Sequence, residues 1–172
     1  MKSVFFILIT LLTGLNLQED EVLKKTRSSF QEIKSEEDIY LLSQVDVESA
    51  KYDARDIIKA YQAAATCMKA QYVFSPVSKQ KFFNRGKQEL EALIEKNKSV
   101  EKVYLRLLLQ FNVPRILNYY KDIDGDILFL ETHLAEAPID LPYKKLMIKN
   151  LVSVADKNEI IDILLQIKVE NC

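Results

Sequence analysis

The chain has 172 residues, of which 48% are hydrophobic and 28% are charged, so it is long enough to form one domain around one core. This composition argues against disorder. Its 24 basic and 25 acidic residues give a formal charge of −1, and no block of like charge dominates either half. We expect neither nucleic acid nor an anionic membrane surface as a partner, because both need a basic patch.

The first eighteen residues have the pattern of a secretory signal peptide. Lys2 precedes an apolar run at residues 4–9 that resumes at residues 11–12. A charged start and an apolar segment of this length are typical of a signal peptide and too short for a comfortable transmembrane span. We therefore expect residues 1–18 to direct export to the periplasm or the extracellular space, with no membrane span after their removal. No A-x-A motif marks a cleavage point, which leaves an uncleaved anchor and a buried first helix as alternatives.

Helical periodicity organises the rest of the chain into a charged N-terminal segment with a short helix, residues 19–46, and a helical domain, residues 47–172. Few large apolar residues occur in the first seventeen positions of that segment, which indicates a loosely docked helix. Apolar residues at three- and four-residue spacing then predict helices over residues 47–72, 77–96, 101–111, 127–135, 143–154 and 160–167. The sequence predicts an all-α fold of about seven helices in antiparallel helix-turn-helix pairs, as a single compact or short solenoid-like domain.

Several residues mark where helices begin or meet. Ser35 precedes an acidic first turn and is an expected N-cap. Ser99 is expected to cap the helix predicted over residues 101–111. Asp156 and Glu159 form a capping-box-like start for the last helix. Gly86 lies on the apolar face of its helix, where glycine is about 1 kcal/mol less favourable than alanine. It therefore indicates close contact with another helix, the alternative being an incidental surface glycine.

The segment 103–111 predicts a central helix, because seven of its nine residues are apolar or aromatic. On a helical projection, Lys102, Arg106 and Gln110 fall within one narrow arc. Apolar side chains occupy about two-thirds of the circumference. This helix should therefore be mostly buried, with one narrow polar stripe.

Arg106 and Gln110, one helical turn apart, are the first candidate ligand-binding residues. A buried guanidinium must be paired, and it recognises carboxylates or phosphates through two parallel hydrogen bonds. Asn112, Asn118 and Tyr119 lie around the following proline, so a groove lined by these five residues would bind a peptide or a small polar molecule. Two other interpretations are that the polar stripe faces solvent, or that Arg106 forms an internal salt bridge between helices.

Cys67 and Cys172 are the only cysteines. In an oxidising compartment they would form one disulfide that ties down the C-terminus. The alternative is that Cys67 is a small buried side chain in a helix and Cys172 is a free thiol. The sequence does not separate these two readings.

No motif for a metal, a cofactor or catalysis stands out. Residues 122–126 resemble the start of a calcium loop, but Gly125 is fourth and His133 is twelfth, where an EF-hand needs glycine at the sixth position and glutamate at the twelfth. His133 is the only histidine, and no nucleophile or ligand set accompanies it. We therefore predict no metal site and no cofactor.

Part of the chain resembles a family of small exported all-helical proteins of flavobacteria and their relatives. The resemblance covers roughly residues 55 to 135 and rests on Leu105, Arg106, Leu107, Gln110, Pro114, Leu117, Tyr119 and Asp126, preceded by Phe83, Gly86, Leu90 and Ile94. The chain departs from the family at Lys98, where proline is usual, and at Asn118, where glycine is usual. The resemblance implies a periplasmic bacterial setting. It implies little else, because the family has no assigned activity.

Together these observations favour a non-enzymatic exported domain that binds a protein, a peptide or a small polar ligand. One alternative is a small hydrolase-like enzyme in which folding brings Arg106, carboxylates and His133 together. Another alternative is a structural component of the cell envelope.

Overall fold

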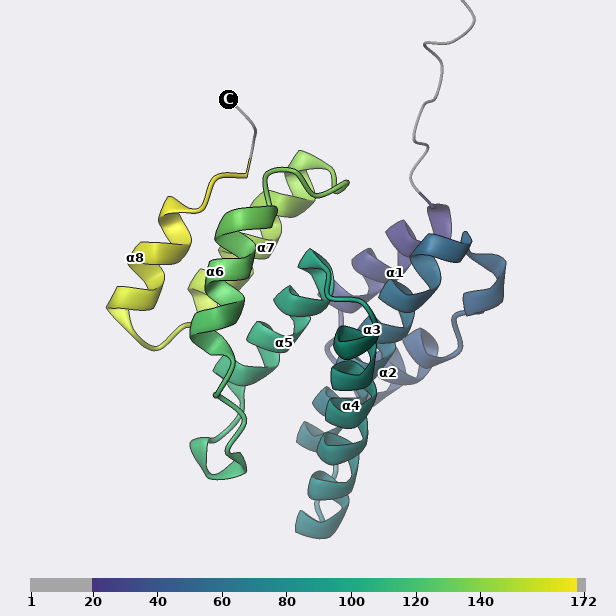
Figure 1. The fold of residues 1–172 in the computed structure, drawn as a ribbon. Coiled ribbons are helices and arrows are strands. Elements are labelled where there is room, and N and C mark those ends of the chain that lie inside the picture. The colour runs from purple at the N-terminus through teal and green to yellow at the C-terminus, as the bar shows by residue number, and fades with distance from the viewer. Residues whose placement is uncertain (1–19, 170–172) are drawn as a thin grey trace, which may run out of the picture.

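The computed structural model describes residues 20–169, and the order of its helices follows the periodicity of the sequence (Figure 1). These residues form α1 (Glu21–Gln31), α2 (Glu36–Ser43), α3 (Tyr52–Met68), α4 (Pro76–Lys96), α5 (Val100–Asn112), α6 (Ile123–His133), α7 (Leu141–Val154) and α8 (Asn158–Gln166). Three short 3-10 helices join them: η1 (Val47–Ser49), η2 (Lys69–Gln71) and η3 (Arg115–Leu117). The all-α prediction is confirmed. The predicted signal peptide, residues 1–18, lies outside the described residues.

The closest helix pair is α3 with α4, and Gly86 makes this contact possible. A Cβ atom at Gly86 would lie 2.7 Å from the backbone nitrogen of Cys67 and even closer to the carbonyl oxygen of Ala63. Both atoms belong to the backbone of α3, so they cannot move aside as a flexible side chain would. The prediction that Gly86 marks a close helix contact is confirmed.

Helix α5 is the central element of the fold. It contacts α3, α4, α6 and α7, and Figure 1 shows it between the group α1–α4 and the group α6–α8. All side chains from Val100 to Gln110 are buried except Leu108, which is half-buried. Lys102 and Arg106 are among the buried ones, so the interpretation of the polar stripe as a solvent-facing surface is wrong.

Helix α1 packs tightly, which the sequence did not indicate. It buries Leu23, Thr26, Arg27 and Phe30 against the core that the later helices share, and it contacts both α2 and α3. The expectation of a loosely docked helix is therefore wrong. The reason is that the charge of Arg27 is buried against a distant carboxylate, which helical periodicity does not reveal.

The predicted helix starts agree with the structure only in part. The helix predicted over residues 47–72 is shorter, because α3 spans only Tyr52–Met68 between the 3-10 helices η1 and η2. Ser35 forms a capping box with α2, as expected. Ser99 is the N-cap residue of α5, but its hydroxyl makes no cap hydrogen bond. Helix α8 begins after Lys157 without a side-chain cap, so the predicted capping-box start does not form. Helix α6 begins at Ile123, inside the predicted break, because acidic residues in its first turn suit the helix dipole.

None of the helices within residues 20–169 combines the length and the apolar composition needed to cross a membrane.

Candidate functional site

Helix α5 carries four buried polar side chains, and three of them have partners inside the protein. The ammonium group of Lys102 donates hydrogen bonds to the carbonyl oxygens of Leu93 at 2.9 Å and Asn97 at 2.7 Å, both at the C-terminal end of α4. Burial lowers the pKa of Lys102. This lysine therefore closes the end of α4, where the last carbonyl groups lack helical partners.

The second polar side chain is Arg106, and its guanidinium is bound by two internal carboxylates. Its Nε and Nη2 atoms each donate to Asp126 at 2.6 Å, and its Nη1 donates to Glu91 at 2.7 Å. The other oxygen of Glu91 accepts a hydrogen bond from the hydroxyl of Tyr119 at 2.5 Å. Burial and this bond to Glu91 raise the pKa of Tyr119. Arg106 thus forms the internal salt bridge that the sequence offered as an alternative to ligand binding.

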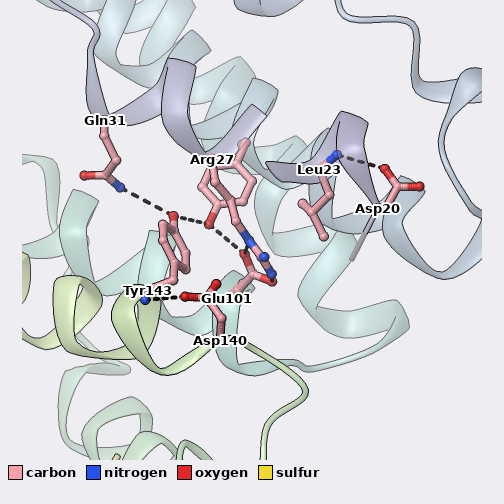
Figure 2. A network of polar contacts seen from close by, with 8 residues as sticks. Asp20, Leu23, Arg27, Gln31, Glu101, Asp140 and Tyr143 are labelled. Carbon is pink, nitrogen blue, oxygen red and sulfur yellow. Dashed lines mark hydrogen bonds and ion pairs between the residues drawn. The ribbon is translucent and has the colours of Figure 1, made fainter. Parts of the chain in front are cut away.

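The third polar side chain, Glu101, belongs to a network of buried groups shown in Figure 2. Arg27 of α1 donates to both of its carboxylate oxygens, from Nε at 2.8 Å and from Nη2 at 2.5 Å. The hydroxyl of Tyr61 donates to Glu101 at 2.7 Å and lies 2.7 Å from the hydroxyl of Tyr143. The guanidinium of Arg27 also lies over the ring of Tyr143, 4.9 Å from its centroid.

The network continues from Tyr143 toward the surface. The amide of Gln31 donates to the hydroxyls of Tyr143 at 3.4 Å and Tyr104 at 3.3 Å. Asn150 donates to the same Tyr104 hydroxyl at 2.9 Å and to the Gln31 carbonyl oxygen at 2.7 Å. Side chains of α1, α3, α5 and α7 are therefore joined by one chain of hydrogen bonds.

The direction of these hydrogen bonds follows from the carboxylate of Glu101. An ionised carboxylate only accepts, so the hydroxyl proton of Tyr61 is committed to it. Tyr143 must then be the donor in the bond between the two hydroxyls. Burial raises the pKa of both tyrosines, which keeps them protonated. We interpret this network as structural, because these groups satisfy one another and leave none aimed at a ligand.

Two N-cap residues fix the starts of α1 and α7, which carry side chains of the network, and both appear in Figure 2. Asp20 accepts from the backbone N–H of Leu23 at 2.9 Å and from that of Lys51 at 2.6 Å, so it fixes the start of α1. Burial alone would raise the pKa of Asp20, but these N–H groups outweigh it and hold the pKa below its ordinary value. Asp140 caps α7 by accepting from the N–H of Tyr143 at 2.9 Å.

Sequence reasoning missed this network, although one signal was present. Glu101 falls among the apolar residues of the helical projection, opposite the polar stripe. A charged residue in an apolar arc must find a partner or stay at the surface. Its partner, Arg27, is 74 residues earlier, so no local pattern identifies it.

The structure divides the five predicted ligand-binding residues. Gln110 and Tyr119 line one small cavity, with a volume of about 280 Å³. Asn112 lines a separate groove, and Asn118 is exposed in a left-handed conformation with φ of 53°. The guanidinium of Arg106 and the hydroxyl of Tyr119 are linked through hydrogen bonds to the same carboxylate, that of Glu91. A single groove formed by all five residues is therefore absent from the described part of the chain.

The separate groove, which we call the apolar groove, has a volume of about 740 Å³. It lies between the end of α3, the first turns of α4, the last turns of α5 and η3. Figure 1 shows that the beginning of α4 and the α5–α6 connection project to the same end of the molecule. The lining is Phe30, Cys67, Met68, Ala70, Gln71, Pro76, Lys79, Gln80, Phe83, Leu105, Leu108, Leu109, Asn112, Val113, Pro114, Ile116 and Leu117.

A third groove, of about 690 Å³, lies between α1, α3, the start of α5 and the α6–α7 connection. Arg27 and Glu101 are among its lining residues, and so is His133. The Nδ1 atom of His133 is 2.9 Å from the carbonyl oxygen of Phe129, and the two rings stack with centroids 4.2 Å apart. Arg106 does not line this groove, so the grouping of Arg106 with His133 that a hydrolase would need is not assembled there.

The described residues contain no cluster of three or more histidine, cysteine, aspartate or glutamate side chains that could hold a metal ion. Cys67 is buried, and its thiol donates to the carbonyl oxygen of Phe83 at 3.4 Å. Burial raises the pKa of Cys67 to about 12, which makes it a poor nucleophile. Cys172 lies outside the described residues, so the disulfide stays a prediction.

No family model, curated protein or solved structure matches this chain. Function is therefore inferred from the geometry of the cavities and from the residues that line them.

Proposed function

We propose that the protein is an exported, non-enzymatic binding domain whose ligand has an apolar body and a negatively charged end. The apolar groove carries this proposal. Its volume of about 740 Å³ lies within the range of small-molecule sites, roughly 300–1,000 Å³. Most of its lining side chains are aliphatic or aromatic, so a polar ligand, which the sequence suggested, suits it less well.

Exposed apolar side chains at the groove support an apolar ligand body. Ile116 is 90% exposed at its rim, and Leu108 is half-buried in its wall. Phe74 and Val77 are also exposed at the adjacent start of α4. Full burial of one such side chain by a ligand contributes about 1.5–3 kcal/mol.

The charge of the groove supports an anionic end. Among the described residues that line the groove, Lys79 is the only charged one, and none of them is acidic. Gln71, Gln80 and Asn112 supply further amide N–H donors. A carboxylate or sulfonate is therefore favoured over an ammonium group.

Calorimetry with two alkyl ligands of equal chain length tests the proposal. We expect dodecanoate to bind below its micelle concentration more tightly than dodecyltrimethylammonium. Lys79→Glu should weaken dodecanoate binding by roughly tenfold or more, as expected for loss of a charge-assisted hydrogen bond. Lys81→Glu makes the same change of charge two residues later, outside the groove, and should leave the affinity unchanged. Equal binding of the two ligands would contradict the anionic end.

The apolar body is tested by a second pair of variants. Ile116→Asp places a charge at the rim and should abolish dodecanoate binding. Leu128→Asp alters another exposed apolar residue, on α6 and outside the groove, and should leave binding intact. If both variants bind dodecanoate with equal affinity, the ligand does not occupy the apolar groove.

Export is proposed from the first eighteen residues alone. Its test is to express the full chain in a Gram-negative bacterium and to measure the mass of the protein in each cell fraction. We expect a periplasmic or secreted form that has lost the N-terminal segment. A full-length protein confined to the cytoplasm would contradict export.

A further inference from the structure

The fourth polar side chain of α5, Gln110, differs from the other three. It is only 5% exposed, and neither its amide nitrogen nor its amide oxygen has a hydrogen-bond partner among the described residues. A buried amide without partners is unfavourable, so native proteins rarely keep one. Glu101, Lys102 and Arg106 on the same helix are all paired. Gln110 is therefore the exception that needs an explanation.

Gln110 lines the cavity of about 280 Å³, which we call the Gln110 cavity. Aromatic and aliphatic side chains form most of its walls: Phe111, Val113, Pro114, Tyr119, Tyr120, Ile123 and Ile160. Four charged residues complete the lining, Arg115 and Lys157 with Asp124 and Asp156. Arg115 and Asp156 are exposed and form an ion pair at 3.6 Å, which places these charges at the solvent side.

We propose that the Gln110 cavity is a binding site for a small neutral molecule in which an N–H lies next to a C=O, such as a lactam or a primary carboxamide. An amide side chain offers one acceptor and two donors. A carboxylate or phosphate would satisfy only the nitrogen of Gln110, and an ammonium group only the oxygen. A ligand with both a donor and an acceptor satisfies both atoms at once.

The rest of the lining agrees with a neutral, planar ligand. The two cations and two anions of the lining cancel, so they select no net charge. Aromatic rings of Tyr119, Tyr120 and Phe111 can pack against a planar amide group. This site is distinct from the apolar groove, because the two share only Val113 and Pro114 among their lining residues.

The test uses 2-pyrrolidone, a lactam, and N-methyl-2-pyrrolidone, which lacks the N–H donor. We expect 2-pyrrolidone to shift the side-chain NH₂ resonance of Gln110 saturably in ¹H–¹⁵N NMR spectra. The N-methyl compound should bind at least tenfold more weakly. Lys79→Glu should bind 2-pyrrolidone like the natural chain, so failure of the apolar-groove proposal would be seen separately.

Gln110→Leu separates a ligand-binding amide from a structural one. Leucine fills a similar volume without polar atoms, so the variant should lose 2-pyrrolidone binding and have a higher Tm in the absence of ligand. A lower Tm would show that the amide has a structural partner and would overturn the proposal, as would undiminished binding. If this variant does not fold, Gln110→Met keeps the unbranched shape and is read in the same way. Equal binding of the two lactams would also overturn the proposal.

Discussion

Gly86 leaves space for the backbone of α3 at the point where α4 crosses it. Gly86→Ala should lower the free energy of unfolding by about 1–3 kcal/mol, because the methyl group meets backbone atoms that cannot yield. This loss includes the gain of up to about 1 kcal/mol that alanine brings to a helix. Urea unfolding followed by circular dichroism measures the change.

Gly125 provides the matched control, since it also lies in a helix. Apart from its chain neighbours and the backbone of its own helix, no atom of the described residues lies within 4 Å of the position that its Cβ would take. Gly125→Ala should therefore raise the free energy of unfolding, by up to about 1 kcal/mol. Two alanine variants of equal stability would show that α3 and α4 are not in close contact at Gly86.

Arg27 and Glu101 form a buried ion pair, with 6% and 2% of their side-chain surfaces exposed. Arg27→Met leaves a buried carboxylate without its counter-ion and should cost about 3–5 kcal/mol. Arg85→Met removes an exposed ion pair with Glu89 on one face of α4 and should change stability by less than about 0.5 kcal/mol. Chemical denaturation of both variants compares them, and similar losses would refute the burial of Arg27.

At the scale of single helices, two serines occupy equivalent N-cap positions but differ in their bonds. The hydroxyl of Ser35 accepts from the N–H of Asp38 at 3.2 Å, and Asp38 accepts in return from the N–H of Ser35 at 2.9 Å. The hydroxyl of Ser99 is buried and has no partner among the described residues. The two caps should therefore contribute unequally.

Ser35→Ala should destabilise the protein by about 1 kcal/mol, because it removes a capping hydrogen bond. Ser99→Ala should leave stability unchanged or raise it, because no hydrogen bond is lost. Thermal unfolding of both variants provides the measurement. A loss at Ser99 as large as that at Ser35 would mean that Ser99 does cap α5 in solution.

The helices were predictable because their signals are local: apolar spacing, caps and prolines lie within one or two turns of each other. Helix α1 was misjudged because its burial depends on the pairing of Arg27 with Glu101, 74 residues away. The start of α6 was placed too late because Gly125 and its acidic neighbours resemble a break. In the helix they occupy the first turn, where both are tolerated.

The candidate sites were predictable only in part, for the same reason. Gln110 was identified from the narrow polar arc of a central helix, and that arc is a local feature. Lys79 and Ile116 were not, because the apolar groove forms only when the start of α4 meets the connection after α5. For Arg106 the sequence leaves ligand binding and an internal salt bridge both open, because its partner Asp126 lies in the next helix, within a segment that resembles a turn.

At the scale of the whole molecule, the buried tyrosines make stability sensitive to high pH. Burial raises the pKa of Tyr61, Tyr104, Tyr119 and Tyr143, four of the eight tyrosines. Unfolded tyrosine ionises near about pH 10, while the folded protein holds these protons to higher pH. The resulting stability is fully present below about pH 10 and is lost as the pH rises above it.

Tyrosinate absorbance and circular dichroism, recorded together during an alkaline titration, test this expectation. The tyrosinate signal of the four buried residues should appear in the same step as the loss of helical signal. In urea, all eight tyrosines should titrate in one wave near about pH 10. Ionisation of all eight with the helices intact would contradict the buried network.

The hydrogen-bond network around Glu101 determines how late in synthesis the core can be completed. Glu101 meets Arg27 and Tyr61, which precede it by 74 and 40 residues, and Tyr143 follows Tyr61 by 82 residues. A nascent chain that ends before Tyr143 cannot yet join α7 to the hydroxyls of the earlier helices. The core is therefore completed late in synthesis. Such a chain stays incompletely folded until α7 has been synthesised.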